Sequence, residues 1–338
     1  MKAVVLTRTG DPGEAFELQE LPDPEPGPGE VRVDLVAAAL NRRDRWLRVG
    51  DAEPPAVLGS DGAGIVSGVG ANVSGVREGD EVVINPALDW GGSELASGPD
   101  FRILGVPDQG TYAERIVLGA HQVRPRPQNL TWEESAALPL AGLTAWRAVV
   151  THAEARPART LLVPGAGGGV ATFAIQIANA RGARVLVTTS SAEKLTRAKQ
   201  LGAVGGADYR DSRWPEPIGL VDAAIDSVGA RAWPGIFECL KPGGRLVSFG
   251  RTSGEDGRVD IARLFFGYWR IQGTTMGSPR EFDALLEHVA SASWRPVVDS
   301  VFPLAEAASA HERLDAPDRF GKIVLAIDEG RLGGSAGG

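Results

Sequence analysis

A run of glycines between two apolar segments constrains the fold of this chain more than any other feature of its sequence. Residues 161–171 read Leu-Leu-Val-Pro-Gly-Ala-Gly-Gly-Gly-Val-Ala, so an apolar stretch stops at the glycines. A helix-like pattern follows over 172–181, and a second strand-like stretch covers 184–189. Glycine allows a sharp turn and a close approach of the backbone to an anion at a helix N-terminus. This order predicts the opening unit of a dinucleotide-binding fold.

The glycine turn fits the dinucleotide fingerprint in two frames. One frame begins at Gly165-x-Gly167. The other places Ala171 at the third position, where Gly or Ala allows a helix to pack closely on a strand. We prefer the second frame, which predicts contact with the cofactor at Gly168, Gly169 and Val170.

The end of the second strand indicates which cofactor is used. NAD sites usually carry an Asp or Glu about 20 residues after the glycines, where it binds the ribose 2′-hydroxyl. Here residues 189–191 are Thr, Ser and Ser, so this place has no carboxylate to repel a 2′-phosphate. Lys194, with Arg197 as a second candidate, is positioned to reach that phosphate. We therefore predict NADP(H), although the alternative that both basic residues only solvate a helix face stays open.

Composition and charge narrow the class of protein. The chain has 338 residues, which suggests about two domains. Its formal net charge of −8 argues against nonspecific binding to nucleic acid. Cys239 is the only cysteine, which excludes an intrachain disulfide and a cysteine zinc cluster. Neither a bilayer-spanning apolar run nor a secretory signal is found, so we expect no membrane association and a cytoplasmic location.

The chain divides into regions of different pattern. Up to about residue 125, short alternating runs broken by Gly and Pro predict a compact β domain. Strand-like runs then alternate with helical ones, at 161–164, 184–189, 222–226, 245–249 and 270–275. That alternation predicts a doubly wound parallel sheet. The remaining runs are a helix at 279–292, a strand at 297–302, a helix near 304–314 and a strand at 322–327.

These patterns predict two domains and a tail. The first domain comprises 1–125 with 280–330, because the C-terminal elements are expected to return to the β domain. The second covers 126–279 and binds the nucleotide. Residues 331–338, which end in a Gly-rich stretch, are expected to be flexible.

Several motifs in a fixed order resemble one enzyme family. They are Ala39–Trp46, Leu58–Val66, Gly79–Val82, Gly110–Glu114, Leu138–Trp146, the glycine turn and Leu240–Leu246. Together they resemble the medium-chain dehydrogenase/reductase superfamily, in particular its quinone oxidoreductase (zeta-crystallin-like) branch. The resemblance implies a GroES-like β-barrel catalytic domain and a Rossmann domain, with the active site in the cleft between them. It also favours the second glycine frame and implies a homodimer formed through the edges of the Rossmann sheets.

Departures from the family pattern concern zinc. Zinc alcohol dehydrogenases of this superfamily have a cysteine where Asn41 stands and a histidine where Ser60 stands. Neither replacement is a good zinc ligand. The segment that matches the structural zinc lobe, 88–105, has lost its cysteines, and its Asp89, Glu94 and Asp100 offer only a weak alternative site for a hard cation. The resemblance therefore implies an enzyme without metal.

Loss of zinc changes the expected chemistry. Zinc stabilises the alkoxide from which an alcohol releases hydride. Without it, hydride transfer to an acceptor that is already electrophilic is easier, which favours a quinone or an α,β-unsaturated carbonyl. Two alternatives stay open: a zinc-free reductase or dehydrogenase of another carbonyl or alcohol in a biosynthetic pathway, and a non-catalytic NADPH-binding protein.

The resemblance also implies roles for individual residues. Asn41 is expected to donate to a substrate oxygen, and Ser60 is a weaker polar candidate. Asp44 is expected to orient the site or relay a proton, unless it is only a carboxylate at a helix N-terminus. None of the four histidines matches a motif, so the proton donor stays unassigned. The further residues expected to bind the cofactor are Thr144, Ser190, Lys194, Tyr209, Ser227, Val228, Phe249, Gly250, Thr274, Thr275, Met276 and Lys322.

Overall fold

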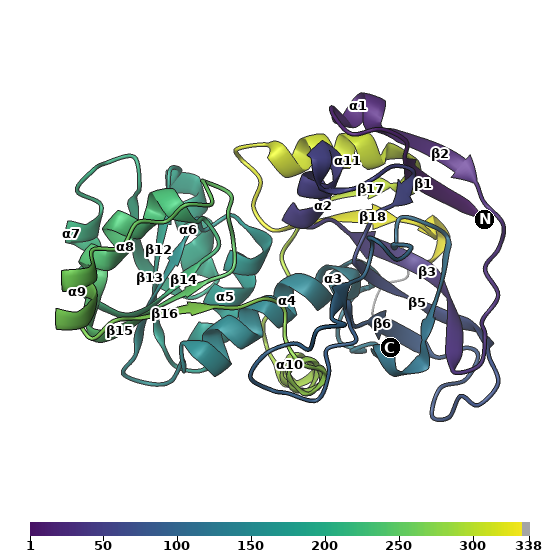
Figure 1. Cartoon of the computed structure of the whole chain (residues 1–338), viewed down its shortest axis with the longest axis horizontal. Helices are drawn as coiled ribbons and strands as arrows, with labels where there is room; N and C mark the ends of the chain where they lie inside the picture. Colours follow the sequence, from purple (N-terminus) through teal and green to yellow (C-terminus); the bar gives the residue numbers. More distant parts are fainter. Residues whose placement is uncertain (333–338) are drawn as a thin grey trace. The chain divides into compact units, whose positions relative to one another are not determined.

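The computed structural model describes residues 1–332, so 333–338 of the predicted tail lie outside the described residues. The chain forms two compact units, coloured along the sequence in Figure 1. The first unit comprises Met1–Leu140 and Ser278–Gly338, and the second comprises Ala141–Gly277.

The second unit contains a six-stranded parallel sheet flanked by helices (Figure 1). Its strands lie in the order β13-β12-β11-β14-β15-β16, and each neighbouring pair is parallel. This order is that of a doubly wound dinucleotide-binding fold, which confirms the predicted fold class. The strands are β11 (Thr160–Pro164), β12 (Arg184–Thr189), β13 (Ala203–Asp208), β14 (Val221–Asp226), β15 (Leu240–Ser248) and β16 (Arg270–Gly273).

Helices connect these parallel strands, as the alternating pattern requires. Helix α5 begins at Gly169, three residues before the predicted start, because its first turn uses the end of the glycine run. Its residues 171–178 are all buried, which fits a helix packed closely on β11 and β12. The helices are α4 (Pro139–Trp146), η3 (Arg147–His152), α5 (Gly169–Ala180), α6 (Ala192–Gln200), α7 (Pro215–Ile218), η4 (Ala230–Ala232), α8 (Trp233–Cys239) and α9 (Ile261–Phe266).

The first unit is built on β-sheets, as predicted for a GroES-like domain. Its main sheet has the order β10-β6-β5-β3-β18-β17, and β9 also pairs with β3. A three-stranded sheet, β2-β1-β4, and the short pair β7-β8 complete it. The strands are β1 (Lys2–Leu6), β2 (Phe16–Glu20), β3 (Glu30–Ala39), β4 (Ala56–Val57), β5 (Asp61–Val69), β6 (Glu81–Ile84), β7 (Ala87–Leu88), β8 (Arg102–Ile103), β9 (Arg115–Gly119), β10 (Val123–Pro125), β17 (Val298–Pro303) and β18 (Lys322–Ala326).

The boundary between the units lies at 140, whereas the sequence pattern placed it at 125. Helix α3 follows β10 but packs on β3, β5 and β18, so it belongs to the first unit. Hydrophobic pattern alone does not say which sheet such a helix covers. The helices of this unit are α1 (Pro12–Ala15), α2 (Arg42–Trp46), η1 (Leu47–Asp51), η2 (Ala120–Gln122), α3 (Trp132–Ala137), α10 (Pro279–Ser291), η5 (Leu304–Glu306), α11 (Ala307–Asp315) and α12 (Glu329–Leu332).

Each unit has its own hydrophobic core. In the second unit, Cys239 packs in a cluster with Leu162, Ile236 and Leu246. Burial raises the pKa of its thiol to about 12, so the thiolate is scarce at neutral pH and the residue acts as a core side chain. Among residues 1–332, no helix combines the length and apolar character needed to cross a membrane.

Candidate functional site

The glycine turn of the second unit leaves the start of helix α5 open. Gly165 has φ +74°, a conformation that favours glycine. Gly168 is the N-cap residue, and in the described part of the chain no side chain caps the helix. A Cβ on Gly168 would meet nothing closer than 3.8 Å, so the approach to the first helical N–H groups is clear. An uncapped N-terminus with free space in front of it fits the pyrophosphate of a dinucleotide.

The end of β12 carries the groups expected to meet the adenosine phosphate. The Tyr209 hydroxyl donates to Ser190 Oγ at 3.0 Å, so residues 19 positions apart meet here. Lys194 lies in the first turn of α6, and its backbone N–H donates to Ser191 Oγ. The nearby carboxylate of Asp208, on β13, is held by Arg210 at 2.6 Å. The structure thus joins Ser190 to Tyr209, and Lys194 lies in the helical turn that follows the same strand.

An acidic residue that the sequence did not suggest organises the next strand end. The Asp226 carboxylate is fully buried and accepts from the N–H groups of Val228 and Gly229, from Trp233 Nε1 and from Ser248 Oγ. Burial raises the pKa of Asp226, and these donors oppose that rise. Asp226 therefore fixes the backbone of Ser227–Gly229 after β14. The sequence feature that could have identified Asp226 is its place as an acidic residue at the end of an apolar strand.

The other residues of this unit that are predicted to bind the cofactor come directly after the ends of strands, or lie on α4. The N–H of Phe249 donates to Asp226 O, and Gly250 packs against Ser227 O, where a Cβ would lie only 2.2 Å away. Thr144 is buried on α4. Because the strands are parallel, their carboxyl ends share one edge of the sheet, where ligands bind in such folds. Cofactor contact stays a prediction for this group, which comprises Thr144, Ser227, Val228, Phe249, Gly250, Thr274, Thr275 and Met276.

In the first unit, a buried ion pair contacts Asn41, one of the predicted catalytic residues. The Lys322 ammonium donates to Asp61 Oδ2 at 2.9 Å, to Asn41 Oδ1 at 2.6 Å and to Leu40 O at 2.6 Å. Asn41 Nδ2 also donates to Asp61 Oδ2, and Leu140 N–H donates to Asp61 Oδ1. Lys322 and Asn41 are 3% and 6% exposed, and Asp61 is fully buried. The network joins the ends of β3, β5 and β18 to the start of α4.

These contacts change what Lys322 and Asn41 can do. An ammonium has three N–H donors, and here all three are taken, so none is left for a pyrophosphate oxygen. The structure therefore places Lys322 in a structural pair and not in the phosphate contact expected for it. Asn41 uses its carbonyl and one N–H within the network, which leaves one amide N–H for a substrate oxygen. Asp61, the centre of this network, was missed because its partners lie far away in sequence.

Asp44 stands at the N-terminus of α2, deep in the unit. Its Oδ2 accepts from Asn41 N–H at 2.7 Å and from the Tyr112 hydroxyl at 3.1 Å. Its Oδ1 is buried and has no hydrogen-bond partner among the described residues. Burial raises the pKa of Asp44 to about 6, against the opposing effect of Arg43. Tyr112 is thus both a buried core residue and a hydrogen-bond partner of this carboxyl group.

Replacement of Asp44 by asparagine should change how stability depends on pH. The folded-state pKa of about 6 lies above the ordinary 3.8, so folding favours the protonated form. The stabilisation is complete below about pH 4 and is lost as the pH rises through about 6. Relative to Asp44→Asn, the wild type should lose about 3 kcal/mol over this range. Urea unfolding of both proteins at several pH values measures this difference, and a difference that does not vary with pH would contradict the assignment.

A cation contacts Ser60, the residue that the family resemblance aligns with a histidine ligand of zinc alcohol dehydrogenases. Ser60 is fully buried, and its hydroxyl donates to Leu104 O at 2.6 Å. Arg43 NH1 donates to Ser60 Oγ and to Leu104 O, both at 3.1 Å. Arg43 and Leu104 lie in segments that the sequence analysis named, but neither residue was given a role there. A guanidinium in this place would repel a metal cation.

The former zinc-lobe segment is held by other contacts. Asp89 forms an ion pair with Arg102 at 2.9 Å, and Glu94 accepts from Ser278 Oγ at 2.5 Å. Trp90 is buried and packs edge-on against Phe101, so it is a core side chain of this segment. Within residues 1–332, no three His, Cys, Asp or Glu side chains are grouped so as to hold a metal ion.

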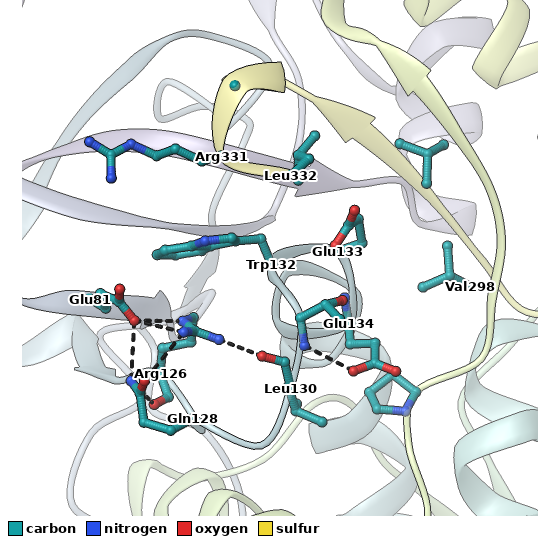
Figure 2. Close-up of a pocket in the computed structure, with 14 residues that line it drawn as sticks. Glu81, Arg126, Gln128, Leu130, Trp132, Glu133, Glu134, Val298, Arg331 and Leu332 are labelled. Carbon is teal, nitrogen blue, oxygen red and sulfur yellow. Dashed lines mark hydrogen bonds and ion pairs between the residues drawn. The ribbon is translucent and has the colours of Figure 1, made fainter. Parts of the chain in front are cut away.

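A separate pocket of the first unit lies near α3 and α12 (Figure 2). Its polar side chains bind one another: Arg126 pairs with Glu81 at 2.7 Å and lies 4.4 Å over the Trp132 ring. Glu134 accepts from Thr131 N–H and pairs with Arg295. None of the predicted site residues lines this pocket. We therefore assign it no part in the candidate site.

The chain matches two families of known domains. Residues 27–128 match the alcohol dehydrogenase GroES-like domain, and residues 169–291 match the zinc-binding dehydrogenase family. A zinc-type alcohol dehydrogenase-like protein of Schizosaccharomyces pombe is 35% identical, over 89% of this chain and 92% of that protein. A quinone oxidoreductase of Pseudomonas aeruginosa is 33% identical, over 96% of this chain and 99% of that protein.

Solved structures agree with the sequence relatives. The crystal structure of an NAD-dependent alcohol dehydrogenase superposes with a TM-score of 0.91 at 43% identity, over 97% of this chain and all of that one. The fold and the relatives of this chain identify it as an oxidoreductase. Its parallel sheet has the topology of folds that bind a nicotinamide cofactor. The chain belongs to the medium-chain dehydrogenase/reductase superfamily.

Proposed function

We propose that this protein is a zinc-independent, NADPH-dependent oxidoreductase that transfers hydride to a quinone or an α,β-unsaturated carbonyl. The contact between Arg43 and Ser60 carries the proposal, because a guanidinium lies beside the residue that the resemblance aligns with a zinc ligand. Elemental analysis of the purified protein tests the metal-free part. Zinc close to one atom per chain would overturn it.

NADP(H) would be held by the second unit, and when bound it supplies the hydride. The open N-terminus of α5 suits the pyrophosphate, and Asp226 holds the backbone of residues 227–229 in place. In the first unit, the free amide N–H of Asn41 suits a substrate oxygen that gains negative charge. A quinone or enone spreads that charge over several atoms, so hydrogen bonds and a proton complete the reduction without a metal.

Loss of Lys194 should weaken NADPH binding selectively. Lys194 is a basic residue in the first turn of α6, four residues after Ser190, and a 2′-phosphate exists only in NADP(H). For Lys194→Ala we expect the Kd for NADPH to rise about tenfold, which is about 1.4 kcal/mol, while the Kd for NADH changes little. Fluorescence titration with both cofactors measures this. Equal losses for the two cofactors would refute a 2′-phosphate role.

The preference for NADPH is a property proposed for this chain alone. The solved relative at 43% identity is named as NAD-dependent. Here the end of β12 consists of Thr189, Ser190 and Ser191, and the carboxylate of Asp208 on the next strand is neutralised by Arg210. If NADH bound more tightly than NADPH to the wild-type protein, the proposed cofactor would be wrong.

A substrate panel tests the reaction itself. We would follow oxidation of NADPH, with NADH as the control, in the presence of benzoquinone, naphthoquinones, phenanthrenequinone and simple enones, with and without a chelator. Turnover of quinones or enones that a chelator does not reduce would support the proposal. Failure with all of them, in a preparation that binds NADPH, would overturn it.

A second candidate activity is the reduction of another carbonyl, or the oxidation of an alcohol. The observation that favours it is the 43% identity to a protein named as an alcohol dehydrogenase. Aldehydes, ketones and primary and secondary alcohols therefore belong in the same panel. Binding of NADPH without turnover of any compound would favour the third possibility, a non-catalytic NADPH-binding protein.

We also propose a homodimer in which β16 of one copy pairs with β16 of another. This strand is at the edge of the sheet, and all four of its residues are exposed. Phe266 and Tyr268, just before it, are each 77% exposed, and such aromatic surface is typical of an interface. Light scattering of the wild type and of Phe266→Asp tests this, since a monomeric wild type would contradict it.

A cytoplasmic location is proposed as well, in keeping with the single cysteine, and cell fractionation would test it.

A further inference from the structure

The carboxylate of Asp226, at the end of β14, has only neutral hydrogen-bond partners. Its Oδ1 accepts from Val228 N–H at 2.8 Å and from Gly229 N–H at 3.1 Å. Its Oδ2 accepts from Trp233 Nε1 at 2.9 Å and from Ser248 Oγ at 3.2 Å. Both oxygens thus receive N–H groups, which can donate but cannot accept. This is the pattern expected around an ionised carboxylate.

No cation balances the charge of Asp226 within residues 1–332. The residue is 0% exposed, and it forms no ion pair within 4 Å in this part of the chain. Asp222, on the same strand, differs, because its carboxylate pairs with Lys241 at 2.9 Å. A buried charge without a counter-ion acts over a longer range than one in water, because the protein interior screens it less.

The loop that Asp226 holds lies beside the glycine turn. A Cβ on Gly165, in the turn after β11, would lie 3.2 Å from Val228 Cγ2. Strands β11 and β14 are neighbours in the sheet, at the point where the strand order reverses. Dinucleotides bind at this point, outside the carboxyl ends of the strands. Asp226 therefore ends a strand at the crevice where a dinucleotide would lie.

The sheet order indicates which half of the dinucleotide is near Asp226. On the side of β12 and β13, the Tyr209 hydroxyl donates to Ser190 Oγ, where the adenosine phosphate is expected. A dinucleotide that crosses the reversal point from there has its nicotinamide half at the ends of β14 and β15. Asp226 ties these two strand ends together, because it belongs to β14 and accepts from Ser248 of β15.

We propose that the Asp226 carboxylate stabilises the oxidised, positively charged nicotinamide ring relative to the reduced ring, and so lowers the reduction potential of the bound cofactor. The inference rests on the proposed function, because it needs a nicotinamide cofactor in the second unit. When hydride passes to the acceptor, two electrons leave with it, a positive charge stays on the ring, and the acceptor then takes up a proton. A fixed negative charge nearby favours this change.

Asp226 is a positioning residue in this proposal. Because it is fully buried, it acts through its field and through residues 227–229, whose backbone it holds, and not by contact with the ring. A purely structural role would affect the oxidised and the reduced cofactor equally, since the loop is the same for both. The electrostatic role affects them differently, and this difference can be measured.

The experiment compares the binding of NADP+ and NADPH without an acceptor. Asp226→Asn would turn an amide N–H toward Trp233 Nε1, so the proteins compared are Trp233→Phe and the double variant Trp233→Phe with Asp226→Asn. In the double variant we expect the ratio of the Kd for NADP+ to the Kd for NADPH to be about tenfold higher. This corresponds to about 30 mV in the potential of the bound cofactor. Isothermal titration calorimetry measures both constants.

Asp222→Asn is the matched control. It makes the same chemical change on the same strand, four residues earlier, at a carboxylate that already has a cationic partner. We expect it to leave the ratio unchanged. Asp226→Asn alone should shift the ratio in the same direction as the double variant, and it serves as the test if the double variant does not fold.

Equal increases in the two Kd values, or no change in either, would overturn the proposal. The same shift is expected between NAD+ and NADH, which carry the same ring, so the result does not depend on the preference for NADPH. A shifted ratio in a protein that reduces neither quinones nor enones would show that only the proposed reaction is wrong. Turnover of these acceptors with an unshifted ratio would show that only the role of Asp226 is wrong.

Discussion

Replacement of Lys322 by methionine is expected to lower the free energy of unfolding of the first unit by about 3–5 kcal/mol. The variant would leave the fully buried Asp61 carboxylate without its only cationic partner within 4 Å among the described residues. Asn41 Nδ2 and Leu140 N–H would still donate to Asp61, but neither carries a charge. Methionine has a similar length, so the loss would come from the uncompensated charge more than from a cavity. Thermal and urea unfolding, followed by circular dichroism, measure it.

Two further variants separate charge from packing. In Lys322→Met combined with Asp61→Asn neither charge of this pair remains, so the double variant should be more stable than Lys322→Met alone. Lys241→Met removes a lysine from a pair of similar length, with Asp222 at 2.9 Å, but Lys241 is 38% exposed. Its loss should cost about 1 kcal/mol or less. A Lys322→Met variant as stable as Lys241→Met would show that the buried pair contributes little.

Replacement of Gly168 by aspartate is expected to have opposite effects on stability and on cofactor binding. Gly168 is the N-cap of α5 with φ −72° and ψ 150°, a conformation open to any residue, and a Cβ fits there. An aspartate would cap the helix and stabilise the protein by up to about 1 kcal/mol. Its charge would occupy the place proposed for the pyrophosphate, so we expect the Kd for NADPH to rise at least about 100-fold.

Gly168→Asn is the matched control, because asparagine caps a helix as well as aspartate does but carries no charge. The difference in the Kd for NADPH between the two variants isolates repulsion from steric effects. Melting temperatures without cofactor give the effect of the cap. If the aspartate variant bound NADPH as tightly as the asparagine variant, the pyrophosphate would not lie at this helix N-terminus.

Much of the second unit could be predicted from the sequence. The strands at 184–189 and 222–226 agree with β12 and β14 to within one residue, because buried parallel strands are short, continuous apolar runs. The predictions for the start of α5 and for the end of the first unit were less accurate. A glycine turn does not say where the first helical residue lies, and an amphipathic helix such as α3 does not say which sheet it covers.

The sequence by itself determined the order of the elements, the glycine turn, the missing carboxylate after β12 and the missing zinc ligands at Asn41 and Ser60. Each of these depends on residue type at a position or on neighbours a few residues away. Only the tertiary structure decided that Lys322 meets Asp61 and Asn41, which are 261 and 281 residues away along the chain. The physical reason is that burial and charge pairing depend on which distant segments pack together, and no local pattern records that.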